Sequence, residues 1–188
     1  QRHLTIPCEM CIRDRVGVVE QGDAAGVVSL TGRLNPGEAT GVPVIHALMK
    51  ALQSDAGFPA EAPGEVLTLL DSPPGSGCQV MECIREADWC LLVAEPTPFG
   101  LHDLAMVAEL TRRLGKRAGL LFNRCAEDSA TLAEQTARQE GMPLIGILPF
   151  DAEVAGMLAQ GGIPARKDET WRARFLCLWA AIRKEAER

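Results

Sequence analysis

Two short apolar runs that lack polar alternation constrain the fold of this chain more than any other feature. They lie at residues 91–93 (LLV) and 119–122 (GLLF), and a segment with helical periodicity, residues 101–114, separates them. A strand with one face in water alternates apolar and polar residues, whereas a strand buried on both faces reads as a continuous apolar run. The sequence therefore predicts an α/β fold with a doubly wound, mostly parallel sheet.

The same alternation of strand-like and helix-like segments runs along most of the chain. Helices are expected at residues 42–53, 77–86, 101–114, 129–140, 152–160 and 169–187. Strands or extended segments are expected at residues 16–20, 26–34, 65–70, 89–94, 118–122 and 143–148. Right-handed crossovers place the turns after parallel strands at one edge of the sheet. We expect a site at that edge, in the turns after Leu70, Ala94, Phe122 and Leu148.

The composition favours one globular domain, or most of one. It argues against broad electrostatic binding to nucleic acid. Of the 188 residues 47% are hydrophobic, and the net charge of −6 is spread over interleaved acids and bases. The seven cysteines lie mostly in apolar segments, as do Cys90, Cys125 and Cys177, which is typical of reduced thiols packed in a core. Without a secretory leader or a membrane-spanning run, the expected location is the cytoplasm.

The last expected helix carries an apolar stripe together with several basic residues. The stripe consists of Trp171, Phe175, Leu178, Trp179 and Ile182. A stripe at helical spacing usually packs on the core, and we expect this helix to pack on the sheet. The alternative is a basic amphipathic helix that lies on a membrane surface.

Residues 1–15 are set apart from the rest of the chain. The segment E-M-C-I-R-D-R at residues 9–15 resembles the in-frame translation of the transposon end sequence used to prepare sequencing libraries. We interpret residues 1–15 as a non-native sequencing-adapter segment and residues 16–188 as the genuine sequence. The competing interpretation takes Cys8-x-x-Cys11 as half of a metal or redox site, for which a second matching pair is missing.

An acidic turn, D-S-P-P-G at residues 71–75, follows the expected strand at residues 65–70. In parallel-sheet nucleotide enzymes, a carboxylate at such a strand end faces the magnesium ion that is bound to the phosphates. An ordinary Asp-Pro turn after a buried strand reads similarly. Nothing before this turn matches the phosphate-binding pattern G-x-x-x-x-G-K-[ST], so we expect a nucleotide-binding fold that is truncated at its N-terminus.

Three motifs together resemble the MinD/ParA-type P-loop ATPases. They are D-S-P-P-G-S-G-C from residue 71, E-P-T-P-F-G-L-H-D-L from residue 95, and Asn123-Arg124. The resemblance is strongest to the subgroup with an inserted 4Fe-4S ferredoxin module, whose patterns are D-G-P-P-G-T-G-C-P-V and E-P-T-P-S-G-L-H-D-L. It covers about residues 16–167 and implies that residues 16–188 are the C-terminal part of a P-loop ATPase domain. The chain departs from these patterns at Ser72, Ser76, Gln79 and Phe99.

The resemblance implies catalytic roles for Asp71 and Gly75. Asp71 takes the Walker B position and accepts a hydrogen bond from a magnesium-bound water, as suits a cation that keeps much of its hydration shell. Gly75 lies in the switch region, where its unhindered backbone N–H can approach the terminal phosphate. Without the family match, Pro-Pro-Gly is an ordinary loop.

The resemblance also implies that Asn123, Arg124, Pro149 and Asp151 bind the nucleotide. The amide of Asn123 offers the donor and acceptor that match the edge of adenine, and Arg124 lies over the ring. Pro149 and Asp151 belong to the turn that closes over adenine and ribose. Two local readings stay open, because Asn123 can cap a turn and Asp151 can be the N-cap of the next helix.

Other residues of the motifs carry no assigned chemistry. The residues E-P-T-P at 95–98 are expected to serve recognition or coupling beside the nucleotide. His102 lacks an adjacent nucleophile or carboxylate pair and reads as a solvated helix residue. Cys78 matches the Gly-Cys position of the subgroup, and we expect it to pack.

These motifs predict an ATP-binding protein that hydrolyses ATP with Mg2+ when intact. The resemblance implies an ATP-dependent homodimer, a 4Fe-4S cluster held by ligands outside this chain, and an iron-sulfur client protein. Because positioning and charge stabilisation dominate phosphoryl transfer, a chain without the phosphate loop is expected to be inactive alone. The alternatives are an ATP-dependent ligase of the same superfamily, of the cobyrinate or dethiobiotin type, and a non-catalytic flavodoxin-like binding module.

Overall fold

The computed structural model describes residues 2–8, 11–24, 26–53, 67–126 and 128–188, and within them the side chains of residues 15–23, 26–53, 67–126 and 128–188. The chain divides into two compact units, which cover residues 1–86 and 87–188. Each unit is described by itself.

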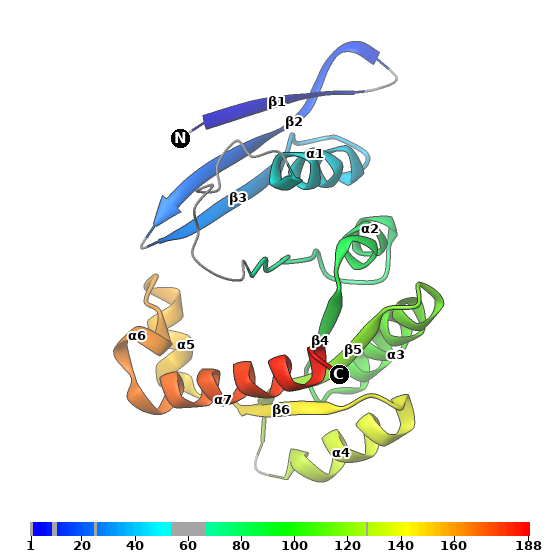
Figure 1. Ribbon diagram of the computed structural model, residues 1–188. Coiled ribbons are helices and arrows are strands. Elements are labelled where there is room, and N and C mark those ends of the chain that lie inside the picture. Colours follow the sequence, from blue (N-terminus) through cyan, green and yellow to red (C-terminus); the bar gives the residue numbers. More distant parts are fainter. Residues whose placement is uncertain (1, 9–10, 25, 54–66, 127) are drawn as a thin grey trace. The chain divides into compact units, whose positions relative to one another are not determined.

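The first unit is built on an antiparallel sheet with the strand order β1-β2-β3 (Figure 1). Its strands are β1 (Arg2–Cys8), β2 (Cys11–Ala24) and β3 (Val27–Leu34), and its helices are α1 (Val42–Gln53) and α2 (Cys78–Glu86). Burial alternates along β3, as in a sheet with one face on a core and one in water. The extended segments expected at residues 16–20 and 26–34 lie in β2 and β3, which pair with each other as antiparallel strands of a hairpin.

Helix α1 covers the inner face of this sheet. Val16 and Val19 of β2 form a buried cluster with Val44 of α1. The helix can approach β3 closely because residue 32 is a glycine, whose added Cβ would lie 2.5 Å from Val44 Cγ1. Apolar packing against α1 thus holds the hairpin.

The expected strand at residues 65–70 is wrong for the part that the structure describes. Residues 67–70 have no strand conformation, and Leu67 and Leu69 are 58% and 82% exposed. Residues 65 and 66 lie outside the described residues. An extended apolar segment becomes a strand only when a neighbouring strand supplies its hydrogen bonds, and no described strand pairs with residues 67–70.

The second unit is built on a parallel sheet with the strand order β4-β5-β6 (Figure 1). The strands are β4 (Trp89–Ala94), β5 (Arg117–Cys125) and β6 (Leu144–Pro149). Helix α3 (Pro98–Arg113) connects β4 to β5, and helix α4 (Ser129–Glu140) connects β5 to β6. This alternation confirms the α/β class and the parallel pairing of these strands.

Both faces of this sheet are covered. Leu121 packs in a buried cluster with Leu148 and Trp171, while its neighbours Leu120 and Phe122 are 0% exposed. Successive residues of a strand point to opposite faces, so the apolar run of β5 is buried on each side. The expectation from its continuous apolar sequence is confirmed. The doubly wound arrangement stays a prediction, because three strands and two crossovers do not establish it.

The chain closes with helices α5 (Ala152–Ala159), α6 (Pro164–Lys167) and α7 (Glu169–Ala186). The sequence reading missed α6, which has only four residues. Helix α7 runs beside β6 (Figure 1) and contacts β5 and β6. In the part of the chain that the structure describes, no helix has the length and apolar content that a bilayer crossing requires.

The expected apolar stripe of α7 packs on the sheet only in part. Trp171 is 7% exposed and Leu178 lies against its cluster, whereas Phe175 and Trp179 are 41% and 36% exposed. At the other end of α7, the guanidinium of Arg117 donates to the carbonyl oxygens of Glu185 and Ala186. A cation at that position satisfies carbonyls that have no partner within a helix.

Candidate functional site

The turns after β4, β5 and β6 lie at one edge of the second unit's sheet, because the strands are parallel. This confirms the expected turn after Ala94. The strands β5 and β6 end later than expected, at Cys125 and Pro149, so Asn123, Arg124 and Pro149 belong to strand ends at this edge rather than to turns. The fourth expected turn, after Leu70, belongs to the first unit. Ligands of open α/β sheets lie beyond the carboxyl ends of the strands, so this edge is the candidate site.

Arg124 is the centre of the site. Its Nη1 lies 3.2 Å from Glu95 Oε1, and its Cζ lies 5.5 Å from the centroid of the Phe150 ring. Residues at the ends of all three strands therefore meet at one guanidinium. The side chains of Arg124 and Glu95 are 58% and 44% exposed, and an ion pair in that setting contributes at most about 1 kcal/mol. Arg124 can consequently exchange this partner for a ligand at little cost.

The backbone of Arg124 has an unusual conformation. Among the described residues it is the one non-glycine residue with a positive φ, 57°. Such a conformation costs about 1–3 kcal/mol and persists where the surrounding structure imposes it. The end of β5 thus presents the Arg124 side chain at the sheet edge in a defined direction.

Asn123 lies next to Arg124 at the end of β5. Its Oδ1 accepts a hydrogen bond of 2.9 Å from the backbone N–H of Arg124, a local contact at the end of β5. An amide oxygen has a second lone pair, and the amide nitrogen carries two donors. Asn123 therefore keeps the donor and acceptor that recognition of adenine requires.

Asp151 is the N-cap of α5, as one of the two sequence readings predicts. Its Oδ1 accepts from the backbone N–H groups of Glu153 and Val154, at 2.9 and 3.1 Å. Its Oδ2 accepts from Trp171 Nε1 at 3.1 Å. These bonds, first that from Val154 and next that from Trp171, hold the pKa of the Asp151 carboxyl below its usual value. A ribose contact would use the remaining lone pairs of the carboxylate.

The segment after β4 is explained by the start of α3. Thr97 is the N-cap, since its Oγ1 accepts from the Gly100 N–H at 3.1 Å, and Pro98 is the first helical residue. The N–H of Thr97 in turn donates to the carbonyl of Glu95 at 2.8 Å. His102 is exposed on α3, as expected for a solvated residue. Within residues 95–98, it is the side chain of Glu95 that contacts Arg124 at the end of the neighbouring strand β5.

We expect Gly100→Ala to destabilise the second unit by about 1–3 kcal/mol, because the new side chain has no room. A Cβ at position 100 would lie 2.4 Å from the Glu95 carbonyl oxygen. Urea unfolding followed by tryptophan fluorescence measures the effect. Gly156→Ala in α5 is the matched control: nothing lies within 4 Å of its Cβ, so stability should rise by about 0.5–1 kcal/mol. Equal effects of the two substitutions would contradict the close turn.

Asp71 and Gly75 lie in the first unit and are both exposed. Gly75 has a φ of 94°, a conformation that residues with a side chain rarely adopt, so the turn itself requires glycine. The structure brings together Glu95, Arg124 and the turn at residues 149–151. It describes Asp71 and Gly75 within the other unit.

No metal centre is formed by the described residues. Among them, no three His, Cys, Asp or Glu side chains are grouped as ligands of one ion. Mg2+ is commonly bound by one or two carboxylates together with phosphate oxygens and water, so it does not require such a group of protein ligands. A 4Fe-4S cluster takes four thiolates, and the described cysteines do not fit it, since they form no such group.

The cysteines only partly follow the sequence reading. Cys90 and Cys125 are buried as expected, and burial raises the pKa of both thiols. Cys177 is exposed, so the expectation that it packs in the core is wrong, and Cys78, which was expected to pack at a helix start, is exposed as well. Cys177 lies on the outer side of α7, and Cys78 is the first residue of α2, where neighbouring side chains do not enclose it.

The sequence reading missed Phe150 as a site residue. The Phe150 side chain is 54% exposed, and its N–H donates to the Cys125 carbonyl at 3.0 Å, which ties its turn to β5. A large exposed aromatic side chain over a guanidinium is a surface on which a planar ring can stack. The signal was present in the sequence as an aromatic residue between Pro149 and Asp151.

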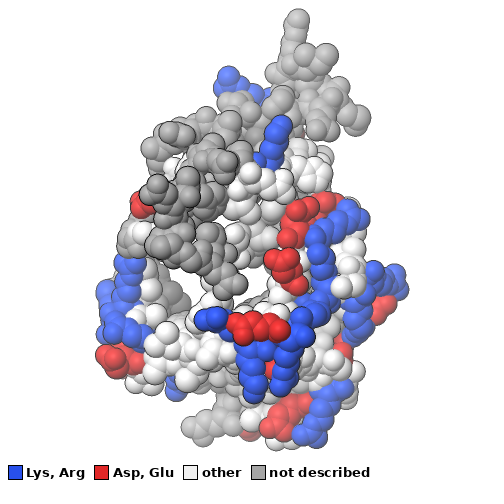
Figure 2. Space-filling model, viewed as in Figure 1, with Lys and Arg blue, Asp and Glu red and all other residues white. Residues whose placement is uncertain are grey.

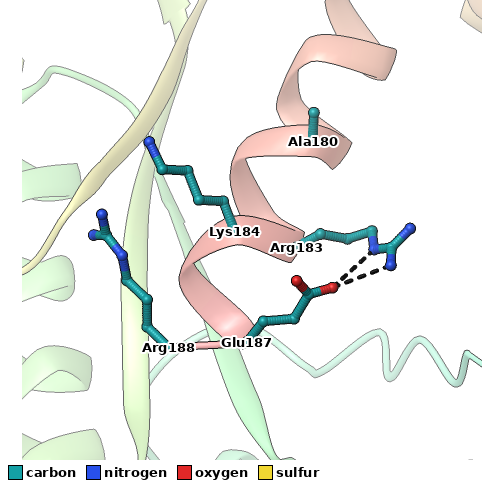
Figure 3. A pocket seen from close by; sticks show the side chains of 5 residues that line it. All are labelled: Ala180, Arg183, Lys184, Glu187 and Arg188. Carbon is teal, nitrogen blue, oxygen red and sulfur yellow. Dashed lines mark hydrogen bonds and ion pairs between the residues drawn. The ribbon is translucent and has the colours of Figure 1, made fainter.

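An open hollow of about 510 Å³ lies at the end of α7 (Figure 3). It is lined by Ala180, Arg183, Lys184, Glu187 and Arg188. Its charges are partly neutralised within the helix, because Arg183 Nη2 lies 3.1 Å from Glu187 Oε1. Arg117, the first residue of β5, binds this end of α7, so the hollow lies at the amino ends of the strands rather than at the carboxyl edge.

Charge on the surface is mixed rather than separated by sign. On the face shown in Figure 2, blue basic and red acidic side chains lie next to one another. Ion pairs also join the two signs along α3, where Glu109 pairs with Arg112 at 2.6 Å and with Arg113 at 2.8 Å. The interleaving expected from the sequence is confirmed on this face.

Comparison with known proteins gives two partial similarities. The chain is 29% identical over 99 residues to the uncharacterized ATP-binding protein MJ0547 of Methanocaldococcus jannaschii, a match that covers 50% of this chain and 37% of that protein. It is 31% identical over 58 residues to the uncharacterized protein MJ0579 of the same organism, covering 31% of this chain and 22% of that protein. No protein-family model matches the chain. In both comparisons the chain spans well under half of the relative's length.

Proposed function

We propose that this chain is part of an adenine-nucleotide-binding protein, and that the carboxyl edge of β4, β5 and β6 holds the base. The observation that carries the proposal is the meeting of residues from three strand ends at Arg124, with Glu95 on one side and Phe150 on the other. The similarity to a protein named as ATP-binding supports the same assignment.

Each side chain of the edge has a distinct part in this proposal. Asn123 reads the adenine edge with one donor and one acceptor. Arg124 and Phe150 offer flat surfaces on which the ring stacks. Glu95 pairs with the Arg124 guanidinium, and Pro149 and Asp151 fix the turn that closes over the base and ribose.

We further propose that the intact protein belongs to the MinD/ParA group and hydrolyses ATP with Mg2+. The motifs at residues 71–78 and 95–104 support this assignment. Asp71 would hold the magnesium through a bound water, and the backbone N–H of Gly75 would approach the terminal phosphate. Mg2+ supplies charge neutralisation between the phosphates. An ATP-dependent homodimer, a 4Fe-4S cluster elsewhere in the protein and an iron-sulfur client belong to the same proposal.

A calorimetric titration of the 188-residue chain with adenosine, ATP and flavin mononucleotide tests the proposed function. Adenosine has about 19 non-hydrogen atoms, which at about −0.3 kcal/mol per atom gives a Kd of about 0.1 mM. Because the sequence holds no phosphate loop, ATP should bind with about the same Kd and show no turnover.

The other outcomes of this titration are equally informative. Flavin binding without adenosine binding would replace the proposal by the flavodoxin-like module. Tighter binding of ATP in the presence of a small organic acid would favour the ligase alternative. Magnesium-dependent hydrolysis that Asp71→Ala abolishes would contradict the predicted inactivity of this chain.

A further inference from the structure

One indole N–H ties the turn after β6 to helix α7. Trp171 Nε1 donates to Asp151 Oδ2 at 3.1 Å. The other oxygen of the same carboxylate, Oδ1, accepts from the N–H groups of Glu153 and Val154 at the start of α5. One oxygen of Asp151 therefore caps α5, and the other binds α7.

Trp171 is itself held firmly in place. It is 7% exposed and packs with Leu121 and Leu148 of the sheet. Its backbone N–H donates to Asp168 Oδ1 at 2.9 Å, which caps α7, and Arg174 Cζ lies 5.3 Å from its ring centroid. A side chain enclosed by the sheet and its own helix has little rotamer freedom, so it can fix the position of the group that it binds.

The position of Asp151 determines that of its neighbour Phe150. The N–H of Phe150 is bonded to the Cys125 carbonyl, and its ring lies under the Arg124 guanidinium. The position of Phe150 is thus fixed by its own N–H and by its neighbour Asp151. If Asp151 shifted, the Phe150 ring would rotate away from Arg124. Contacts therefore run without interruption from Trp171 through Asp151 and Phe150 to Arg124.

We propose that Trp171 is a positioning residue of the nucleotide site, holding the Phe150 turn against Arg124 through its bond to Asp151. This inference rests on the proposed function of the carboxyl edge. Trp171 is buried, so it acts on the ligand through Asp151 rather than by direct contact. Affinity then depends on the arrangement of this turn before the nucleotide arrives.

Trp171→Phe tests the proposal with a smaller aromatic side chain at the same position. Phenylalanine keeps an aromatic ring in the cluster and removes the N–H that Asp151 accepts. We expect adenosine to bind roughly three- to tenfold more weakly to this variant at a temperature where the chain is fully folded. Trp179→Phe, the same substitution at a more exposed site of α7, is the matched control and should leave the Kd unchanged.

A double-substitution cycle distinguishes positioning from general destabilisation. In Asp151→Asn the amide oxygen can still cap α5, but the amide nitrogen cannot accept from Trp171. If Trp171 acts through Asp151, adding Trp171→Phe to this variant should cause no further loss of affinity. Additive losses would overturn the proposal.

The pKa of the Asp151 carboxyl, measured by NMR, tests the bond between Trp171 and Asp151 independently of any nucleotide. Removal of a bond that stabilises the charged carboxylate should raise this pKa in Trp171→Phe and not in Trp179→Phe. An unchanged pKa, or a raised pKa with an unchanged adenosine Kd, overturns the positioning role. Failure of the unsubstituted chain to bind adenosine overturns the proposed function instead.

Discussion

Replacement of Phe122 by alanine is expected to destabilise the second unit by about 3–5 kcal/mol, the range for a fully buried phenylalanine. Phe122 is 0% exposed in the middle strand of the parallel sheet. Truncation removes its apolar contacts and leaves a cavity that the paired strands on either side cannot fill. Since a typical domain is stable by only about 5–15 kcal/mol, this is a large share of the total.

Urea unfolding of Phe122→Ala, followed by tryptophan fluorescence, measures this loss. The matched control is Phe99→Ala, because Phe99 is 85% exposed on α3 and its truncation removes little buried surface. Its effect should stay within about 0.5 kcal/mol. Similar midpoints for the two variants would show that the apolar run of β5 is not the core of this unit.

The core strands and several helix ends were predictable from the sequence because local signals mark them. The expected ends of α1, β4 and α4 agree with the structure. Helix α4 stops before Gly141, whose φ of 64° is the left-handed conformation that ends many helices. The helix expected at residues 101–114 starts earlier in the structure, at Pro98. Thr97 and Pro98, its N-cap and first residue, were expected to lie in the preceding turn.

The remaining features depend on partners that a sequence does not specify. The segment 67–70 has the composition of a strand, but strand formation needs a neighbour. The contact between Arg124 and Phe150 joins residues from the ends of two strands, and the positive φ of Arg124 follows from no local signal. Position on the sheet edge was therefore predictable, whereas the pairing of side chains there was not.

Replacement of Asn123 by alanine is expected to weaken adenosine binding by about 10- to 100-fold. The substitution removes a donor and an acceptor at once, and two lost hydrogen bonds of about 1 kcal/mol each, with an unpaired edge of the base, give this range. Asn123 is half-buried at the end of β5, so water would replace its bonds poorly. The hydrogen bond from the Arg124 N–H is also lost, which adds to the effect.

The titration of three proteins with adenosine tests the central claim, that this edge reads adenine, most directly. They are the unsubstituted chain, Asn123→Ala, and Gln135→Ala, which removes an exposed amide on α4. The account predicts a Kd of about 0.1 mM for the unsubstituted chain and Gln135→Ala, and loss of most affinity in Asn123→Ala. Equal affinity of all three proteins, or no binding by any of them, would contradict it.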